Sequence, residues 1–224
     1  MIKETLFFLR HGPAIQKRKK ELGLVAFMQA FARDIDADGY AALRTELVGE
    51  LRGDVLEIGT GTGATFPYYR KDARVCAIEP DDDFRAAAEH AAENAHTEIR
   101  VLPGAGETLP FEDDSFDAVC ASLVLCSVTS PAQTLEEFKR VLRPGGQVRL
   151  MEHVRSEHWL AGPLMVILNP IWLRINNVGC NWHRRTVETV REAGFAIQTI
   201  TAHKIYSKAA ATAFPIRIIK AVFP

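Results

Sequence analysis

The sequence lacks the features that would support a disulfide framework, a transmembrane segment or nucleic-acid binding. Its four cysteines, Cys76, Cys120, Cys126 and Cys180, form no C-x-x-C pair, which predicts buried, reduced thiols and no metal site. No stretch reaches the ~20 apolar residues of a spanning helix, and the N-terminus has no secretory cleavage signal. The net charge is −1, so nucleic acid is not an expected partner. We therefore expect a cytoplasmic protein with one well-buried core.

A glycine-dense turn follows a short apolar strand in GDVLEIGTGTG, residues 53–63. Glycine lets the backbone approach a ligand closely, and a following helix presents free N–H groups. The pattern Gly59-x-Gly61-x-x-Ala64, with Glu79 about 20 residues later, also fits the dinucleotide fingerprint, so a dehydrogenase stays open at this point. Glu57 separates the two cofactors, because a carboxylate suits an ammonium and a sulfonium but repels a pyrophosphate. The segment therefore favours S-adenosylmethionine over NAD.

Four ordered motifs resemble the class I S-adenosylmethionine-dependent methyltransferases. They are EIGTGTG at 57–63, IEP at 78–80, LPFxxxSFD at 109–117 and RVLRPGG at 140–146. The resemblance implies an α/β, Rossmann-like fold with a mostly parallel seven-stranded sheet and helices on both faces. It also implies an N-terminal helical cap at 1–52 that forms one compact unit with a methyltransferase domain at 53–224.

The hydrophobic pattern after residue 53 alternates between strands and helices, which predicts a parallel sheet covered on both faces. The resemblance implies that residues 203–224 return as an antiparallel edge strand. The expected strands are 54–58, 74–79, 98–102, 116–124, 146–152 and 195–201, and the expected helices are about 63–70, 81–95, 130–142 and 183–193.

The same resemblance implies which residues contact the cofactor. The loop glycines frame its methionine and ribose, Glu57 orders the amino group and Glu79 accepts the ribose hydroxyls. Residues 105–107 flank adenine, and Leu123 with Cys126 lies beneath the sulfonium. The full expected set is Glu57, Gly59, Thr60, Gly61, Gly63, Glu79, Pro80, Ala105, Gly106, Glu107, Leu123 and Cys126.

Three shorter strings are similar to the methyltransferase-like 7, or thiol methyltransferase, branch, which is close to ubiquinone and menaquinone biosynthesis methyltransferases. They are LVLCSV at 123–128, EHV at 152–154, and Gly179-Cys180 followed by Arg185-Thr186. This implies a small, hydrophobic acceptor with a thiol favoured. O- or C-methylation of a phenol or quinol, and N-methylation of a lipid amine, stay open.

Two departures from that branch bear on the membrane and on adenine. Animal members carry a hydrophobic N-terminal membrane segment, whereas residues 16–21 here read QKRKKE, which leaves peripheral membrane contact open. Ala105 stands where many relatives place Asp or Asn on the adenine amino group, so backbone and apolar contacts must hold adenine.

Three parts of the chain are candidates for the acceptor site. Two amphipathic helices within 14–51, separated by a break at 36–39, and the apolar segment 159–175 either cover the acceptor or pack as core. His153 and His183 are candidates for a general base, with Glu152 orienting His153 or contacting the acceptor.

Two other classes of function compete with the methyltransferase. LFFLRHGPA at 6–14 resembles the strand and Arg-His-Gly opening of histidine phosphatases, in which His11 would be phosphorylated. A non-catalytic cofactor-binding protein would keep the glycine loop without an acceptor site. The sequence predicts no oligomeric state.

Overall fold

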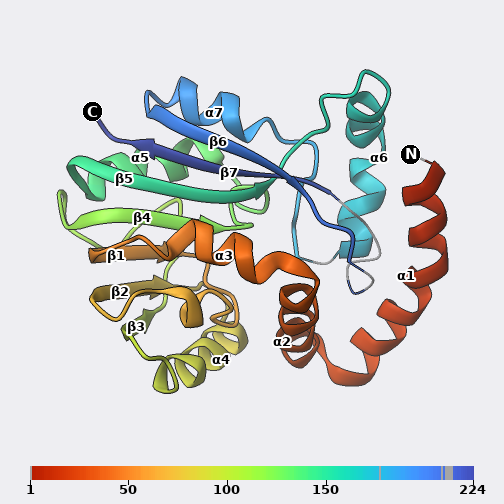
Figure 1. The fold of residues 1–224 in the computed structure, drawn as a ribbon, viewed down its shortest axis with the longest axis horizontal. Helices are drawn as coiled ribbons and strands as arrows, with labels where there is room; N and C mark the ends of the chain where they lie inside the picture. Colours follow the sequence, from red (N-terminus) through yellow and green to blue (C-terminus); the bar gives the residue numbers. More distant parts are fainter. Residues whose placement is uncertain (1, 177, 208, 210–213) are drawn as a thin grey trace.

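A computed structural model of the chain describes residues 2–176, 178–207, 209 and 214–224, the side chains of residues 2–9 excepted. The strands form one sheet in the order β3-β2-β1-β4-β5-β7-β6, and only the pairs that involve β7 are antiparallel (Figure 1). The predicted α/β fold with a mostly parallel seven-stranded sheet is thereby confirmed. The strand bounds are β1 Gly53–Ile58, β2 Ala73–Ile78, β3 Glu98–Leu102, β4 Phe116–Ser122, β5 Leu142–His153, β6 Ala196–Lys204 and β7 Pro215–Val222.

Helices cover both faces of the sheet because successive strand residues point to opposite sides. On one face Val55 and Met151 pack with Leu47 of α3. On the other face Leu56 and Leu150 pack with side chains of α5 and α7. The helix bounds are α1 Ile2–Leu22, α2 Leu24–Ile35, α3 Ala41–Val48, α4 Asp82–Glu93, α5 Pro131–Val141, α6 Ala161–Asn176 and α7 Thr186–Glu192.

The N-terminal region is helical from residue 2. The predicted break at 36–39 is confirmed as a kink between α2 and α3, where Gly39 has φ of 120°. Residues 2–22 form the single helix α1. The histidine-phosphatase alternative requires a strand around His11, and that prediction is therefore wrong. In the part of the chain that is described, no helix has both the length and the apolar character needed to cross a membrane. The expected boundary at residue 52 stays a prediction.

Three expected elements differ in the structure. The helix expected at about 63–70 is wrong: turns lead into a short 3-10 helix, Phe66–Tyr68, because Gly61 and Gly63 adopt positive φ and Pro67 follows. The last strand is not at the edge, since β7 pairs antiparallel with β5 and also with β6. The helix expected from residue 183 begins only at Thr186.

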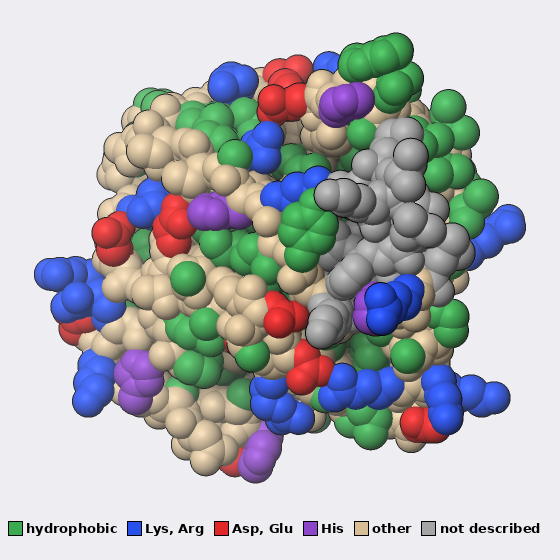
Figure 2. All heavy atoms as spheres, turned by 45° about the vertical axis from the view of Figure 1, so that its right-hand side comes forward, with side chains coloured by type: hydrophobic (Ala, Val, Ile, Leu, Met, Phe, Trp, Pro, Cys, Tyr) green, Lys and Arg blue, Asp and Glu red, His purple; other side chains and the backbone are tan. Residues whose placement is uncertain are grey.

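Helix α6 is apolar on the side that faces outward. Trp159, just before it, is 76% exposed, and Ile167 and Ile171 on the helix are 71% and 57% exposed. Figure 2 shows hydrophobic side chains gathered at the upper right of this face, over the region that α6 occupies in Figure 1. The segment 159–175 is therefore a helix with an exposed apolar stripe, and its inner side faces the strand ends described next.

Candidate functional site

The candidate site lies at the carboxyl ends of the parallel strands. Strand β1 pairs with β2 on one side and β4 on the other, so the connections leave in opposite directions between β1 and β4. Ligands of open α/β sheets bind in the crevice at such a reversal. The loops after β1, β2, β4 and β5 carry most of the residues that the sequence predicts for the site.

The three glycines of the first loop differ in what requires them. Gly59 and Gly63 have φ of 60° and 77°, and a Cβ would lie 2.8 Å from Val124 Cγ2 and 2.7 Å from the Phe66 ring. Packing alone therefore excludes larger residues at both positions. At Gly61, with φ of 58°, a Cβ would meet nothing within 4 Å. Bare backbone beside open space is what a cofactor in van der Waals contact with the loop requires, so the loop fits S-adenosylmethionine.

Glu79 connects the end of β2 to this glycine loop. Its Oε2 accepts a hydrogen bond from the Gly61 amide at 2.8 Å, and its Oε1 accepts one from the Asp81 amide at 3.2 Å. Burial raises the pKa of the Glu79 carboxyl, although the two amides oppose the shift. Asp81 in turn accepts hydrogen bonds from the amides of Asp83 and Phe84 and caps α4, as expected for a residue that starts this helix.

Glu57 is buried at the end of β1 and is surrounded by hydroxyl groups. Its carboxylate accepts hydrogen bonds from Thr60 at 3.1 Å, from Tyr69 at 2.6 Å and from Thr65. Burial raises the pKa of Glu57, and these hydroxyls with the Arg44 charge oppose the shift. The side chain is thus held in one orientation before any ligand binds.

Glu152 braces the loop that follows β4. Its carboxylate is fully buried and accepts hydrogen bonds from the amides of Val124, Leu125 and Cys126 at 2.9, 2.8 and 3.1 Å. Burial raises its pKa to about 7 against the effect of these amides. The loop begins at Leu123, whose φ of 62° is unusual for a leucine. The structure therefore gives Glu152 three backbone partners, and its role toward His153 or the acceptor stays a prediction.

Cys126, His153 and Cys180 meet beside this loop. The Cys180 Sγ lies 3.5 Å from the His153 Nδ1, and the ligand atoms of all three residues lie within 4.8 Å of one another. The Cys126 thiol and, against burial, the His153 side chain lower the pKa of Cys180, while the pKa of Cys126 is raised by Cys180 and by burial. The two cysteines and the histidine therefore interact directly within one cluster.

Aromatic rings form a wall next to His153, and we call Trp172, Trp182 and Phe214 the aromatic wall. The indole rings of Trp172 and Trp182 stack with centroids 4.8 Å apart, and Phe214 packs edge-on against both of them and against His153. Trp182 Nε1 donates a hydrogen bond to the Met165 carbonyl of α6 at 2.7 Å. The inner side of α6 thus joins an apolar surface at the end of β5.

The N-terminal helices reach the same strand ends through two buried residues. Arg44 of α3 donates hydrogen bonds to Asp36 at 2.8 Å and to Ser122 Oγ, at the end of β4, at 3.4 Å. Burial raises the pKa of Tyr40 to about 12, and the nearby Cys180 adds to the shift while Arg44 opposes it. The kinked segment between α2 and α3 therefore lies close to the cysteine cluster.

Other predicted residues lie at the margin of the site. Glu107 accepts hydrogen bonds from the amides of Thr129 and Ser130 ahead of α5, and a Cβ at Gly106 would approach Thr134 Cγ2 to 3.0 Å. His183 lies in the turn before α7, where burial and the charges of Arg184 and Arg155 lower its pKa. Ala105 forms an isolated bridge with Thr108.

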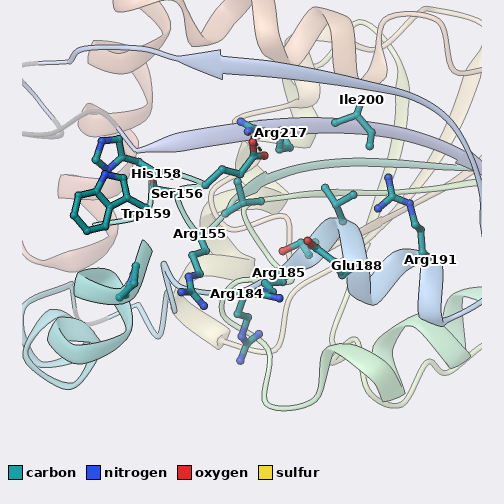
Figure 3. A pocket seen from close by; sticks show the side chains of 15 residues that line it. Arg155, Ser156, His158, Trp159, Arg184, Arg185, Glu188, Arg191, Ile200 and Arg217 are labelled. Atoms are coloured by element: carbon teal, nitrogen blue, oxygen red, sulfur yellow. Dashed lines mark hydrogen bonds and ion pairs between the residues drawn. The ribbon is translucent and has the colours of Figure 1, made fainter. Parts of the chain in front are cut away.

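A second hollow, rich in arginine, lies outside this crevice. It has a volume of about 450 Å³ and is bounded by the segment after β5, by α7 and by the strands β6 and β7. Figure 3 shows the side chains of Arg155, Arg184 and Arg185 in its wall, with Arg217 paired to Glu157 at 2.9 Å. Within the described residues, no side chain predicted for cofactor binding or catalysis lines it.

Sequence reasoning missed the cluster of Cys126 with Cys180 and the aromatic wall. Cys126 was expected only beneath the cofactor and Cys180 only as a buried thiol, because the short strings that contain them carry no spacing that links the two. The available signal was positional: Cys126 follows β4 and His153 ends the neighbouring parallel strand β5, so both lie at one edge of the sheet.

Comparisons with known proteins agree with this geometry. Residues 56–150 match a family described as a methyltransferase domain. The thiol S-methyltransferase TMT1B of Rattus norvegicus is 36% identical over 146 residues, 63% of this chain and 59% of the relative. The phosphatidylethanolamine N-methyltransferase of Cereibacter sphaeroides is 30% identical over 154 residues, 67% of this chain and 68% of the relative.

Comparison with solved structures shows the same fold in a methyltransferase. A solved S-adenosylmethionine-dependent methyltransferase from Methanosarcina mazei has a TM-score of 0.60 at 20% identity, covering 75% of this chain and 91% of that chain. The match to the rat thiol methyltransferase spans less than two thirds of that protein's length.

Proposed function

Because this chain belongs to the class I S-adenosylmethionine-dependent methyltransferases, we propose that it transfers a methyl group to the sulfur of a small, hydrophobic thiol. The observation that carries the proposal is the aromatic wall beside His153 at the carboxyl end of β5. Acceptors of open α/β enzymes enter at this edge, and stacked indoles favour an apolar or aromatic body over a charged one. The similarity to thiol S-methyltransferases supports sulfur as the methylated atom.

For the cofactor, we assign the residues of the first two strand ends. S-adenosylmethionine, when bound, supplies a methyl group on a positively charged sulfur. The Gly61 backbone would contact it, the Glu79 carboxylate would accept its ribose hydroxyls, and Glu57 would order its amino group. The buried, preoriented carboxylates support these roles, because a fixed acceptor loses little side-chain entropy on binding.

In-line methyl transfer requires positioning more than acid–base chemistry. An effective local concentration gained by orientation supplies much of the rate, and apolar walls exclude competing water. A thiol with a pKa near ~8.5 is partly ionised at neutral pH, whereas a phenol or an alcohol needs a base. For a hydroxyl acceptor, His153 would be the base that takes the proton. The backbone hydrogen bonds of Glu152 would make it a positioning residue for the Cys126 loop.

An acceptor panel tests the proposal. Purified protein is incubated with S-adenosylmethionine and, separately, with thiophenol, a quinol, a phenol and phosphatidylethanolamine, and methylated products are measured by mass spectrometry. We expect methylated thiophenol as the main product. Preferred methylation of the quinol or of the lipid amine would replace the thiol by that acceptor, and cofactor binding without any product would favour a non-catalytic binding protein.

We also propose that the chain works in the cytoplasm. All four cysteines are free thiols, and a reducing compartment keeps a close pair such as Cys126 and Cys180 from forming a disulfide.

A further inference from the structure

Two of the four free cysteines converge with a histidine from a third segment. Cys126 lies in the loop after β4, His153 is the last residue of β5, and Cys180 lies in the loop before α7. The two loops are tied together, because the Asn181 amide donates a hydrogen bond to the Cys126 carbonyl at 2.7 Å. The cluster is therefore held by the fold and not by a local sequence motif.

Backbone hydrogen bonds fix the position of each ligand-bearing segment. The Glu152 carboxylate accepts a hydrogen bond from the Cys126 amide at 3.1 Å. The side chain of Asn176, at the end of α6, donates a hydrogen bond to the Cys180 carbonyl at 3.1 Å. His153 continues strand β5, whose register with β7 extends to its pairing with Ile216. Side chains on such braced segments are preorganised for a metal ion, since little rearrangement is needed on binding.

The spacing of the three ligand atoms agrees with tetrahedral zinc. Zinc lies about 2.3 Å from a cysteine sulfur and about 2.0–2.1 Å from a histidine nitrogen, so tetrahedral angles put that sulfur and nitrogen about 3.5 Å apart. The Cys180 Sγ and the His153 Nδ1 are 3.5 Å apart. Two sulfurs on one zinc lie about 3.8 Å apart, within the 4.8 Å that bounds the cluster.

The ligand set of the cluster suits a divalent cation. The ionisable groups next to it are the buried Glu152 carboxyl and Arg184, which donates hydrogen bonds to the carbonyls of Leu125 and Val128. Two thiolates neutralise the zinc charge, and soft sulfur with imidazole nitrogen is a ligand set that zinc prefers.

We propose that Cys126, His153 and Cys180 bind a zinc ion, and that the thiol acceptor binds the same ion as its fourth ligand. Three protein ligands are the number found in zinc sites that keep a position for water or substrate. The metal site stands on the three side chains alone, whereas the identity of the fourth ligand rests on the proposed thiol methyltransferase function. His153 then acts as a metal ligand through Nδ1 in place of a general base.

The reaction balances with no further reactant. The acceptor thiol loses its proton to solvent as its sulfur binds zinc, and the sulfur lone pair then forms a bond to the methyl carbon of S-adenosylmethionine. The bond between that carbon and the sulfonium sulfur breaks, and its electron pair stays on the departing S-adenosylhomocysteine. The product is a neutral thioether, a weaker zinc ligand than the thiolate, so it leaves the ion.

Metal binding is tested on the full chain without an activity assay. Reduced protein is loaded with zinc chloride, dialysed, and measured for zinc per chain by mass spectrometry. Cobalt(II) replaces zinc in a parallel sample, because thiolate ligands give it a strong near-ultraviolet absorption. The variants are Cys126→Ser and Cys180→Ser, with Cys76→Ser, on strand β2 and outside the cluster, as the matched control.

We expect one zinc per chain in the wild-type protein and in Cys76→Ser, and at least tenfold weaker zinc binding in the two cluster variants. Wild-type protein that retains no zinc and shows no cobalt–thiolate absorption would overturn the site, whether or not the variants fold. Equal zinc binding in folded Cys180→Ser would overturn it too. A third such outcome is a Cys126–Cys180 disulfide in the purified protein together with no zinc binding once that disulfide has been reduced.

The fourth position is tested by adding thiophenol to the cobalt form. A change in the cobalt spectrum that is absent with phenol supports the thiol as ligand, and an unchanged spectrum overturns that part of the proposal. Methylation of thiophenol by zinc-free protein would show that the reaction does not use the metal, and the proposed thiol methyltransferase function would stand. A zinc-loaded protein that methylates no thiol would instead overturn the proposed function and leave the metal site.

Discussion

The carboxylate of Glu79 holds the backbone amide of Gly61, with 2.8 Å between Oε2 and the nitrogen. This bond joins the end of β2 to the glycine loop after β1. A single residue thereby fixes the shape of the loop and presents an acidic edge to the crevice. The consequence is that loop geometry and ribose recognition depend on the same side chain.

Replacing Glu79 tests that dependence. Hydrogen bonds to a charged group contribute about 1.5–3 kcal/mol each, so Glu79→Ala should weaken S-adenosylhomocysteine binding at least tenfold in isothermal titration calorimetry. Glu93→Gln, at the exposed end of α4, is the matched control and should bind normally. Unchanged affinity in folded Glu79→Ala would contradict the assignment, and selective binding of NAD would return the dehydrogenase alternative.

The glycines of the loop should separate stability from binding. In Gly59→Ala the new methyl group would lie 2.8 Å from Val124 Cγ2, so we expect a clear loss of unfolding free energy in urea. In Gly61→Ala the methyl group meets open space, and the left-handed backbone alone costs roughly 1–2 kcal/mol. Gly61→Ala should nevertheless lose cofactor affinity by titration calorimetry. Normal affinity in that variant would mean that the cofactor does not approach this backbone.

The ion pair between Glu137 and Arg140 on α5 predicts a pH-dependent contribution to stability. Hydrogen bonding to Arg140 lowers the pKa of Glu137 below its usual value of 4.5. Its contribution is therefore fully present above pH 4.5 and is lost as the pH falls through the lower, folded-state pKa.

Glu137→Gln should accordingly destabilise the protein by about 1–3 kcal/mol in urea unfolding at pH 7, and the difference should shrink as the pH falls below 4.5. Glu136→Gln, at an exposed position one residue earlier, should change stability little at any pH. A constant difference for Glu137→Gln across this range would show that the pair does not titrate as described.

Substitution of His153 distinguishes a base from a metal ligand. A general base predicts that His153→Ala slows hydroxyl acceptors by about 10²–10⁴ and thiols much less. A zinc ligand predicts that thiol turnover falls at least tenfold together with zinc content. We expect the second result, measured as kcat for thiophenol and zinc per chain. If His153→Ala keeps its zinc and loses turnover only of hydroxyl acceptors, His153 is a general base and not a zinc ligand.

The aromatic wall should contribute to acceptor affinity. Aromatic contacts add about 0.5–1.5 kcal/mol beyond burial, so Trp172→Ala should raise the KM for thiophenol about two- to tenfold or more. Trp159→Ala is the matched control, because this tryptophan is 76% exposed before α6. If both variants shift KM equally, the effect is not specific to the wall.

The sequence predicted the sheet well because its strands are short apolar runs with a strong periodicity. It also located Glu57 and Glu79 at strand ends, where parallel topology brings them together. The helix predicted after the glycine loop was wrong, since the hydrophobic pattern does not show how Gly61, Gly63 and Pro67 act in combination. The place of β7 inside the sheet depends on long-range pairing, which local pattern does not encode.

The candidate site was predictable only in part for the same reason. Residues in one motif, such as those of the glycine loop, are neighbours in the chain and in space. Cys126 and Cys180 are distant in sequence and are brought together by two loops that Asn181 ties to each other. Glu152 shows the converse: the adjacent positions 152 and 153 suggested a pair, but successive residues of a strand point to opposite faces.

Helix α6 has apolar side chains both on the side that faces the aromatic wall and on the side that faces solvent. Substitutions on the two sides should therefore have separate effects. Met165 and Trp172 contact Trp182 of the aromatic wall, whereas Ile167 and Ile171 are exposed to the medium around the protein. Polar replacements at the outer positions would therefore make the protein easier to concentrate and crystallise while its chemistry stays as it is.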